Sequence, residues 1–304
     1  MPQIIEAGQW SEFVKELPEV PFLMDQLIPR NGKTILHGPP GSGKSAFLWG
    51  VGNAVSQGVP YLGFKTLRTR TLLISVDMNA YELNTRWGKS FDPCFDLIAP
   101  PKFDCTSPAF IRGELYKQVN GHMMEKQVGL VMIDAIGGTH LGRSAMDDDT
   151  ATAVDAAISA WLPGCAILML AHDRKVKFAE SGRPIRQGAE GLLGSQMWRS
   201  NCTNQLHMEN AGNNASVIYH EKCQVGPKYP EPIRVYIDEF GNCQLWGKAQ
   251  AQECHKKYQD AVDLLGIGGL KATERNEAVA KYYQVDIRTV RRWCAKFREI
   301  DDES

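Results

Sequence analysis

Long apolar segments are missing from this sequence of 304 residues. Its longest apolar runs, residues 128–133 and 166–171, have the length of a buried strand and are too short to cross a bilayer. The first residues include Glu6, Glu12 and Glu16 and lack the apolar core of a secretory signal. We therefore expect no membrane partner and a cytoplasmic location.

Paired cysteines and a sizeable net charge are missing as well. The eight cysteines include no C-x-x-C pair and no Cys/His group with zinc spacing, so reduced thiols are the plain interpretation. The formal net charge of -1 provides no overall field that would attract nucleic acid. Any affinity for DNA must therefore come from local clusters of basic residues.

The clearest motif is a glycine-rich stretch, residues 37–45, which has the G-x-x-x-x-G-K-S pattern of a P-loop. It follows an apolar run at 34–36 and precedes a helical pattern that begins at residue 46. This is the strand, loop and helix context that a P-loop requires. The context and the full pattern together disfavour the alternative, a glycine-rich turn before an ordinary helix.

The P-loop predicts a site for ATP or GTP. Its glycines let successive backbone N–H groups point inward, and the following helix adds its positive N-terminal end. Lys44 should reach the β- and γ-phosphates, and the Ser45 hydroxyl should bind Mg²⁺. The predicted nucleotide-binding residues are Gly38, Pro39, Pro40, Gly41, Ser42, Gly43, Lys44, Ser45 and Ala46.

Strand and helix patterns alternate after the P-loop. Apolar, β-rich runs occur at residues 71–77, 95–99, 128–133 and 166–171. Helical patterns lie between them at residues 81–89, 108–126 and 147–162. This alternation predicts a doubly wound, mainly parallel α/β sheet with the nucleotide at the carboxyl ends of its strands.

The pattern changes from residue 201 onward. Short β-rich runs separated by turn residues occur at 204–208, 216–220, 233–237 and 243–246. These runs predict an antiparallel extension at the edge of the sheet. A polar helical pattern at residues 249–261 and a glycine-rich stretch at 266–269 come next.

The last part of the chain contains helical patterns at residues 273–283 and 287–297, joined by a short turn. These are the proportions of a helix-turn-helix. We therefore predict an ATPase domain at residues 1–247, a linker helix at 248–269, and a small all-α helix-turn-helix domain at 270–304 that binds DNA.

Acidic residues follow two of the predicted strands. Asp134 ends the run at 128–133 and fits the Walker B role of holding Mg²⁺. Asp77 ends the strand that should lie beside it, where a carboxylate could deprotonate the attacking water. His172 follows the next strand and could hydrogen-bond the γ-phosphate, and a purely structural histidine is an equal alternative.

These motifs, together with residues 22–29 and 171–175, resemble the RecA-like ATPases of the plasmid RepA hexameric helicase type, relatives of the DnaB-type replicative helicases. The resemblance covers roughly residues 20–247. It implies a RecA-like fold, ATP and Mg²⁺ as cofactors, and a self-assembled ring, most simply a hexamer, that acts on single-stranded or duplex DNA. The sequence departs from this family at Asp77, where the family has glutamate, and at Ala171, where it has the first of two histidines.

The resemblance also implies a residue that acts on the neighbouring subunit. Residues 222–227 resemble the K-x-R-x-G-P strand end that DnaB-type helicases insert into the next nucleotide site. Lys222 matches this pattern, whereas Gln224 stands where the family has its arginine finger. Hydrolysis is then slow, or the charge comes from another arginine among Arg174, Arg183, Arg186 and Arg199. The alternative is an ordinary Gly-Pro hairpin with a solvated lysine.

Two basic regions are candidate DNA surfaces. The basic residues of the long loop after His172 are Arg174, Lys175, Lys177, Arg183 and Arg186. In the last helical pattern, Arg288, Arg291 and Arg292 share one face, with Val290 on the opposite face, as in a recognition helix. A flexible surface loop and a helix that docks on a protein are the respective alternatives.

We interpret the chain as an ATP-hydrolysing, ring-forming DNA motor, a RepA-like replicative helicase or translocase. The alternative is a DNA-bound ATP switch or loader that hydrolyses slowly and unwinds nothing. Gln224 and Asp77 favour this alternative, whereas the basic loop favours the motor. A P-loop kinase of small molecules is a third interpretation, weakened by the predicted DNA-binding tail and by the lack of an evident lid.

Overall fold

The computed structural model describes most of the chain, namely residues 7–9, 12, 15, 22–87, 92–143, 147–173, 196–212, 214–238, 241–283, 286–291 and 294. The predicted DNA-contacting residues Arg174, Lys175, Lys177, Arg183, Arg186 and Arg292 lie outside the described residues. The P-loop and the predicted strand-end acids lie within them.

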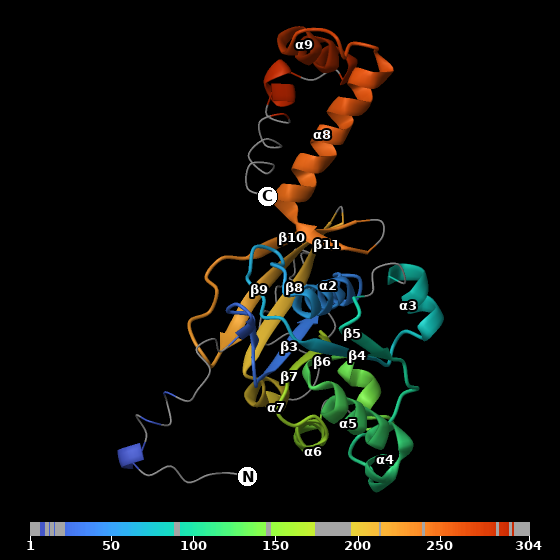
Figure 1. Ribbon diagram of the computed structural model, residues 1–304, viewed down its shortest axis with the longest axis vertical. Coiled ribbons are helices and arrows are strands. Elements are labelled where there is room, and N and C mark those ends of the chain that lie inside the picture. The colour runs from blue at the N-terminus through green and yellow to red at the C-terminus, as the bar shows by residue number, and fades with distance from the viewer. Residues whose placement is uncertain are drawn as a thin grey trace, which may run out of the picture.

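A single large sheet organises the described part of the chain (Figure 1). Its strands lie in the order β11-β10-β9-β8-β3-β7-β6-β4-β5. Their bounds are β3 (Lys33–Gly38), β4 (Arg70–Ser75), β5 (Phe95–Ile98), β6 (Val128–Asp134), β7 (Ala166–His172), β8 (Asn204–Gly212), β9 (Ala215–Cys223), β10 (Ile233–Ile237) and β11 (Cys243–Leu245). A separate small hairpin consists of β1 (Phe22–Met24) and β2 (Ile28–Pro29).

The direction of the strands confirms the predicted architecture. Strands β5, β4, β6, β7, β3 and β8 are parallel to one another. Strands β9, β10 and β11 then continue the sheet in antiparallel pairs. The sheet is therefore doubly wound and mainly parallel with an antiparallel edge. Strand β8 extends beyond the predicted residue 208 to Gly212 because its pairing with β9 continues to Ala215.

Helices cover both faces of the parallel part. They are α2 (Lys44–Gln57), α3 (Ala80–Trp87), α4 (Pro108–Arg112), α5 (Glu114–Lys126), α6 (Asp148–Trp161) and α7 (Gln196–Asn201). Alternate residues of β6 explain the layers, because successive side chains of a strand point to opposite faces. Leu130 and Met132 pack in the core that contains Phe47 of α2, whereas Val131 and Ile133 pack in the core that contains α5 and α6.

One predicted helix is interrupted. The expected continuous helix at 108–126 is wrong, since it forms α4 and α5 with Gly113 between them. Gly113 is extended, with φ -76° and ψ 165°, and its N–H closes α4 on the Phe110 carbonyl at 2.9 Å. Ser107 caps the start of α4 by accepting a hydrogen bond from the Phe110 N–H. Glycine has the lowest helix propensity apart from proline, which accounts for the break at this position.

The C-terminal part forms a small helical unit at the end of a long helix (Figure 1). Helix α8 (Trp246–Leu264) begins directly after β11, so Trp246 opens a helix and does not end a strand as expected. It is followed by α9 (Ala272–Tyr283) and by helical residues at 287–291. A separate apolar core includes Tyr258 and Val262 of α8, Val279 of α9, and Val290. The last turns of α8 therefore belong to the same packed unit as the two helices after it.

Among the described residues, none of the helices has the length and apolar character needed to span a membrane.

Candidate nucleotide site

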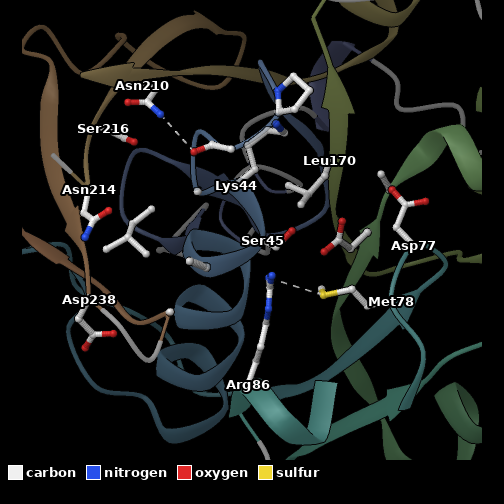
Figure 2. Close-up of a pocket in the computed structure, with 18 of the residues that line it drawn as sticks. Lys44, Ser45, Asp77, Met78, Arg86, Leu170, Asn210, Asn214, Ser216 and Asp238 are labelled. Carbon is white, nitrogen blue, oxygen red and sulfur yellow. Dashed lines mark hydrogen bonds between the residues drawn. The ribbon is translucent and has the colours of Figure 1, made fainter. Parts of the chain in front are cut away.

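A pocket of about 890 Å³ lies at the carboxyl edge of the parallel strands, in front of the first turn of α2 (Figure 2). Its walls include the P-loop, the ends of β4, β6 and β7, and part of α3. The far side is formed by residues of the β8–β9 and β10–β11 connections. This is the edge at which ligands bind in open α/β sheets, as the sequence predicted.

The P-loop has the backbone that its glycines require. Gly41 and Gly43 have φ angles of 77° and 87°, in the left-handed region that favours glycine. Gly38 is needed for a different reason, because a Cβ atom there would lie 2.1 Å from the carbonyl oxygen of Met208. The loop therefore packs directly against β8 on one side and opens toward the pocket on the other.

Lys44 folds back onto the loop. Its Nζ donates hydrogen bonds to the carbonyl oxygens of Gly38 and Pro39, both at 2.8 Å, and its side chain is almost fully buried. Burial lowers the pKa of Lys44 to about 8, and the negative charges of Asp173 and Asp134 oppose this shift. Two loop carbonyls thus hold the ammonium group at the wall of the pocket. Charged phosphate oxygens are better acceptors for an ammonium group than these neutral carbonyls.

Ser45 and Asp134 form the predicted metal-binding pair. The Ser45 side chain lies beside the Asp134 carboxylate and favours its charged form. Burial raises the pKa of Asp134 to about 6, and the neighbouring Asp77 charge adds to the rise, while Ser45, Lys44 and Arg86 act against it. A buried carboxylate beside a hydroxyl offers the hard oxygen ligands that Mg²⁺ prefers. The residues present therefore fit a magnesium ion bound together with phosphates.

Asp77 lies beside this pair. It follows β4, whose Ser75 is the register partner of Asp134 on β6, and its backbone N–H donates to the Asp134 carbonyl at 3.1 Å. Its carboxylate is 3.8 Å from the Nζ of Lys102. Figure 2 shows Asp77 on the side of the pocket opposite Asn210, Asn214 and Asp238. The structure thus brings Asp77 and Asp134 to one edge, as neighbouring strands predicted.

His172, the last residue of β7, also lines the pocket. Desolvation lowers its pKa, and the positive charge of Lys44 lowers it further. A neutral imidazole at this position can accept or donate a hydrogen bond with a phosphate oxygen. Of the predicted catalytic residues, Lys44, Asp77, Asp134 and His172 therefore share one pocket.

Lys222 lies elsewhere. It is on β9 and pairs with Gln205 near the start of β8, at the end of the sheet away from the P-loop of the same chain. Its Nζ donates to the carbonyl oxygens of Arg199, Ser200 and Cys202 at 2.7, 3.1 and 2.6 Å. The side chain therefore closes the C-terminal end of α7 within its own chain.

A family model described as an AAA domain matches residues 5–177, which is more than half of the chain. This chain belongs to the AAA domain family. Curated proteins give no match to its sequence.

Among the solved structures that share the fold of this AAA domain is a DnaB-like replicative helicase with a TM-score of 0.55 and 12% identity. The match covers 80% of this chain and 68% of that one. A solved ATPase domain has a TM-score of 0.54 and 11% identity over 78% of this chain and 96% of its own. A KaiC-like protein from the archaeon Pyrococcus horikoshii has a TM-score of 0.50 and 10% identity, covering 76% of this chain and 96% of its own. At these identities the likeness establishes the fold alone, a RecA-like P-loop ATPase fold.

Several pocket residues of this AAA domain were not predicted as functional. Arg86 on α3 reaches toward Ser45 and lies 3.9 Å from the sulfur of Met78 (Figure 2). Polar side chains from the antiparallel edge complete the far wall: Asn210, Asn214, Ser216 and Asp238. In the sequence these four residues look like ordinary turn and strand-end residues. They line the pocket only because the edge strands fold beside the P-loop.

Two of the arginines predicted to contact DNA, Arg288 and Arg291, lie within the described residues. Arg288 and Arg291 are exposed, whereas Val290 between them is buried in the core of the C-terminal unit. Arg288 lies 3.6 Å from the carboxylate of Asp286. One face of this helical segment is therefore basic and the other is packed.

Proposed function

We propose that this AAA domain protein binds ATP with Mg²⁺ in the P-loop pocket and hydrolyses it. The observation that carries this proposal is the convergence of Lys44, Ser45 and Asp134 at the N-terminus of α2, with Asp77 beside them. This set contains a cation for the phosphates, oxygen ligands for a magnesium ion, and a carboxylate able to act as a base. GTP remains the alternative nucleotide, since the P-loop itself does not distinguish adenine from guanine.

Each residue has a separate role in the proposed reaction. Lys44 exchanges the Gly38 and Pro39 carbonyls for oxygens of the β- and γ-phosphates. Ser45 and Asp134 hold the Mg²⁺, which neutralises the charge on the phosphates when it is bound. Asp77 accepts the proton of the attacking water, and His172 hydrogen-bonds the γ-phosphate.

We further propose that hydrolysis drives a ring-forming DNA motor of the RepA-like replicative helicase or translocase type, most simply a hexamer. Two observations support this proposal. The fold is shared with a DnaB-like replicative helicase. The C-terminal unit presents Arg288 and Arg291 on an exposed face, as a helix-turn-helix that contacts DNA requires. In this proposal residues 1–247 form the ATPase domain, and the DNA-binding unit begins within α8.

A DNA-bound ATP switch or loader is the second candidate. It is favoured by the environment of Lys222, which is bonded to three carbonyls of its own chain, and by Gln224 in place of an arginine finger. A missing finger costs about 10³ to 10⁵ in hydrolysis rate. Slow turnover suits a protein that resets a bound state, whereas a motor needs repeated rapid cycles.

Phosphate release, mass photometry and strand displacement separate these candidates. A motor should form rings with ATP and single-stranded DNA, hydrolyse ATP faster when that DNA is present, and displace a labelled strand. A switch should bind DNA in an ATP-dependent way and displace no strand. If DNA does not change the rate of hydrolysis and the protein stays monomeric, both candidates are contradicted. Only the ATPase activity would then remain.

A further inference from the structure

A buried cluster of His37, Asp173 and His207 lies next to the nucleotide pocket but does not line it. The Nδ1 atom of His37 is 2.6 Å from Oδ1 of Asp173, and the Nε2 atom of His207 is 3.0 Å from Oδ2. His37 and His207 are direct partners in the pairing of β3 with β8, and Asp173 follows the last residue of β7. We call this cluster the Asp173 clamp, since one carboxylate joins residues from three neighbouring strands.

The clamp has the donor types of a transition-metal site, and its ligand atoms lie within 4.8 Å of one another. Its two rings, however, are stacked, with centroids 4.6 Å apart and planes inclined by only 17°. A metal ion binds along the lone pair of an imidazole nitrogen and therefore lies in the plane of each ring that binds it. Two nearly parallel ring planes do not share such a position, whereas the two oxygens of one carboxylate can reach one ring each. The geometry therefore favours a hydrogen-bonded clamp over a metal site.

The neighbours of the rings define the direction of these hydrogen bonds. The Nε2 atom of His37 lies 2.9 Å from the Nε2 atom of Gln205, which is an amide donor. His37 is therefore neutral, accepts from Gln205 and donates its Nδ1–H to Asp173. Burial lowers the pKa of His37, in agreement with this assignment. The Nδ1 atom of His207 faces Glu209 at 3.5 Å, and its Nε2–H donates to the other oxygen of Asp173.

The backbone of Asp173 also contacts the P-loop. Its N–H donates to the carbonyl oxygen of Gly38 at 3.3 Å, and the Nζ of Lys44 donates to the same oxygen at 2.8 Å. When Lys44 turns to a phosphate, the Asp173 N–H remains as a donor to this carbonyl, so the loop does not lose its hydrogen bond. Asp173 therefore holds two successive residues, His37 by its side chain and Gly38 by its backbone.

We propose that Asp173 is a positioning residue for nucleotide binding. Through the clamp it fixes the end of β3 against β7 and β8, so that the first P-loop glycine and Lys44 meet the phosphates in a preorganised arrangement. A loop that is already ordered loses less conformational entropy when its ligand binds. The inference rests on the proposed ATP site, and Asp173 acts through Gly38 and Lys44 without touching the nucleotide.

The test compares Asp173→Ala with Asp173→Asn in the full chain. Alanine removes both acceptors. Asparagine keeps an acceptor for His37 and offers an N–H to His207, whose ring can accept it once its other nitrogen carries the proton toward Glu209. The measurements are binding of a fluorescent ATP analogue with Mg²⁺ and steady-state phosphate release.

We expect Asp173→Ala to raise the Kd of the analogue and the KM for ATP about tenfold, the effect of losing roughly one hydrogen bond. The kcat should stay within about twofold, because Lys44 contacts the phosphates in both the ground state and the transition state. Asp173→Asn should remain close to the wild type. A fall in kcat with unchanged KM would overturn the proposal.

Asp96→Ala is the matched control. Asp96 on β5 also bridges two cationic or imidazole partners, with Arg70 and His122 both at 2.9 Å, but it lies at the far edge of the sheet. Its loss should lower the melting temperature and leave the KM for ATP unchanged. An equal rise in KM in Asp96→Ala would show that Asp173→Ala acts by general destabilisation, which would overturn the proposal.

Further measurements cover the cases that these variants leave open. If Asp173→Ala does not fold by circular dichroism, His207→Gln replaces it, and an unchanged Kd in that variant overturns the proposal. A stoichiometric transition metal that leaves the protein with Asp173→Asn would also overturn it in favour of a metal site. Normal analogue binding in every folded variant defeats this inference alone, whereas a wild type that binds no nucleotide defeats the proposed function as well.

Discussion

The Ser45 side chain in the first turn of α2 lies beside the Asp134 carboxylate at the end of β6. Burial raises the pKa of Asp134 to about 6, and this acid lies next to the lysine of the P-loop. Lys44→Ala and Asp134→Ala should each reduce Mg²⁺-dependent phosphate release by at least about 10²-fold, because the first removes the cation for the phosphates and the second removes the acid that would hold the Mg²⁺. Lys33→Ala is the control, since Lys33 at the start of β3 pairs with Asp155 of α6 and does not line the pocket. Normal turnover in Lys44→Ala would contradict the site.

Asp77→Asn should bind ATP and fail to hydrolyse it. The amide keeps the size of the carboxylate, but it cannot accept a proton from water. Single-turnover hydrolysis measured at saturating protein separates this chemical step from binding and release. Unchanged single-turnover rates would exclude Asp77 as the base, and a large loss of ATP affinity would indicate that it acts on the metal ion instead.

Arg86→Ala should slow hydrolysis while the fold is kept. Arg86 reaches the pocket from α3, and its positive charge lowers the pKa of Asp134 against the effect of burial. Its loss removes one cation from the wall of the pocket. The exposed Arg112 on α4 provides a matched control for the loss of an arginine. Equal rates of phosphate release in the two variants would show that Arg86 does not contribute to hydrolysis.

Lys222→Ala is expected to affect both folding and hydrolysis. Three carbonyls of residues 199–202 lose their ammonium donor, so the free energy of unfolding should fall by about 1–3 kcal/mol. If Lys222 also acts on a neighbouring subunit, mixtures with Lys44→Ala should regain activity, because one kind of interface then has both lysines. Mixtures that co-assemble and stay inactive at every ratio would leave Lys222 with its structural role alone.

Acidification should destabilise the protein in two steps. Burial holds the pKa of His37, His140 and His220 below the ordinary value of 6.5, so the unfolded chain takes up protons first as the pH falls through 6.5. Burial works to raise the pKa of Asp173, but hydrogen bonds from His207 and His37 hold it below 3.8, so its contribution is lost only below about pH 4. Urea unfolding between pH 5 and 8 measures the first step. A free energy of unfolding that does not change over this range would contradict it.

Sequence motifs and strand patterns alone predicted the central residues of this candidate site. The P-loop pattern, the strand-length apolar runs and the acids that follow them are local features, and parallel strands necessarily bring their carboxyl ends to one edge. Lys44, Ser45, Asp77, Asp134 and His172 could therefore be named before the strand order was known. The alternation of strands and helices likewise predicted the doubly wound sheet, and the short runs separated by turn residues predicted its antiparallel edge.

Tertiary structure decided the contacts that join distant segments. Arg86 lines the pocket because α3 packs beside it, and no residue spacing encodes that packing. His37 and His207 are 170 residues apart in sequence, and they meet only because β8 pairs with β3. Lys222 was predicted from a family motif, but the carbonyls that it binds belong to a helix end whose position depends on packing. The sequence likewise did not predict that Tyr258 and Val262 belong to the C-terminal core. They lie on a polar helix, and they are buried only because α9 packs against them. Local patterns specify which groups a strand end carries, whereas non-local packing specifies which groups meet.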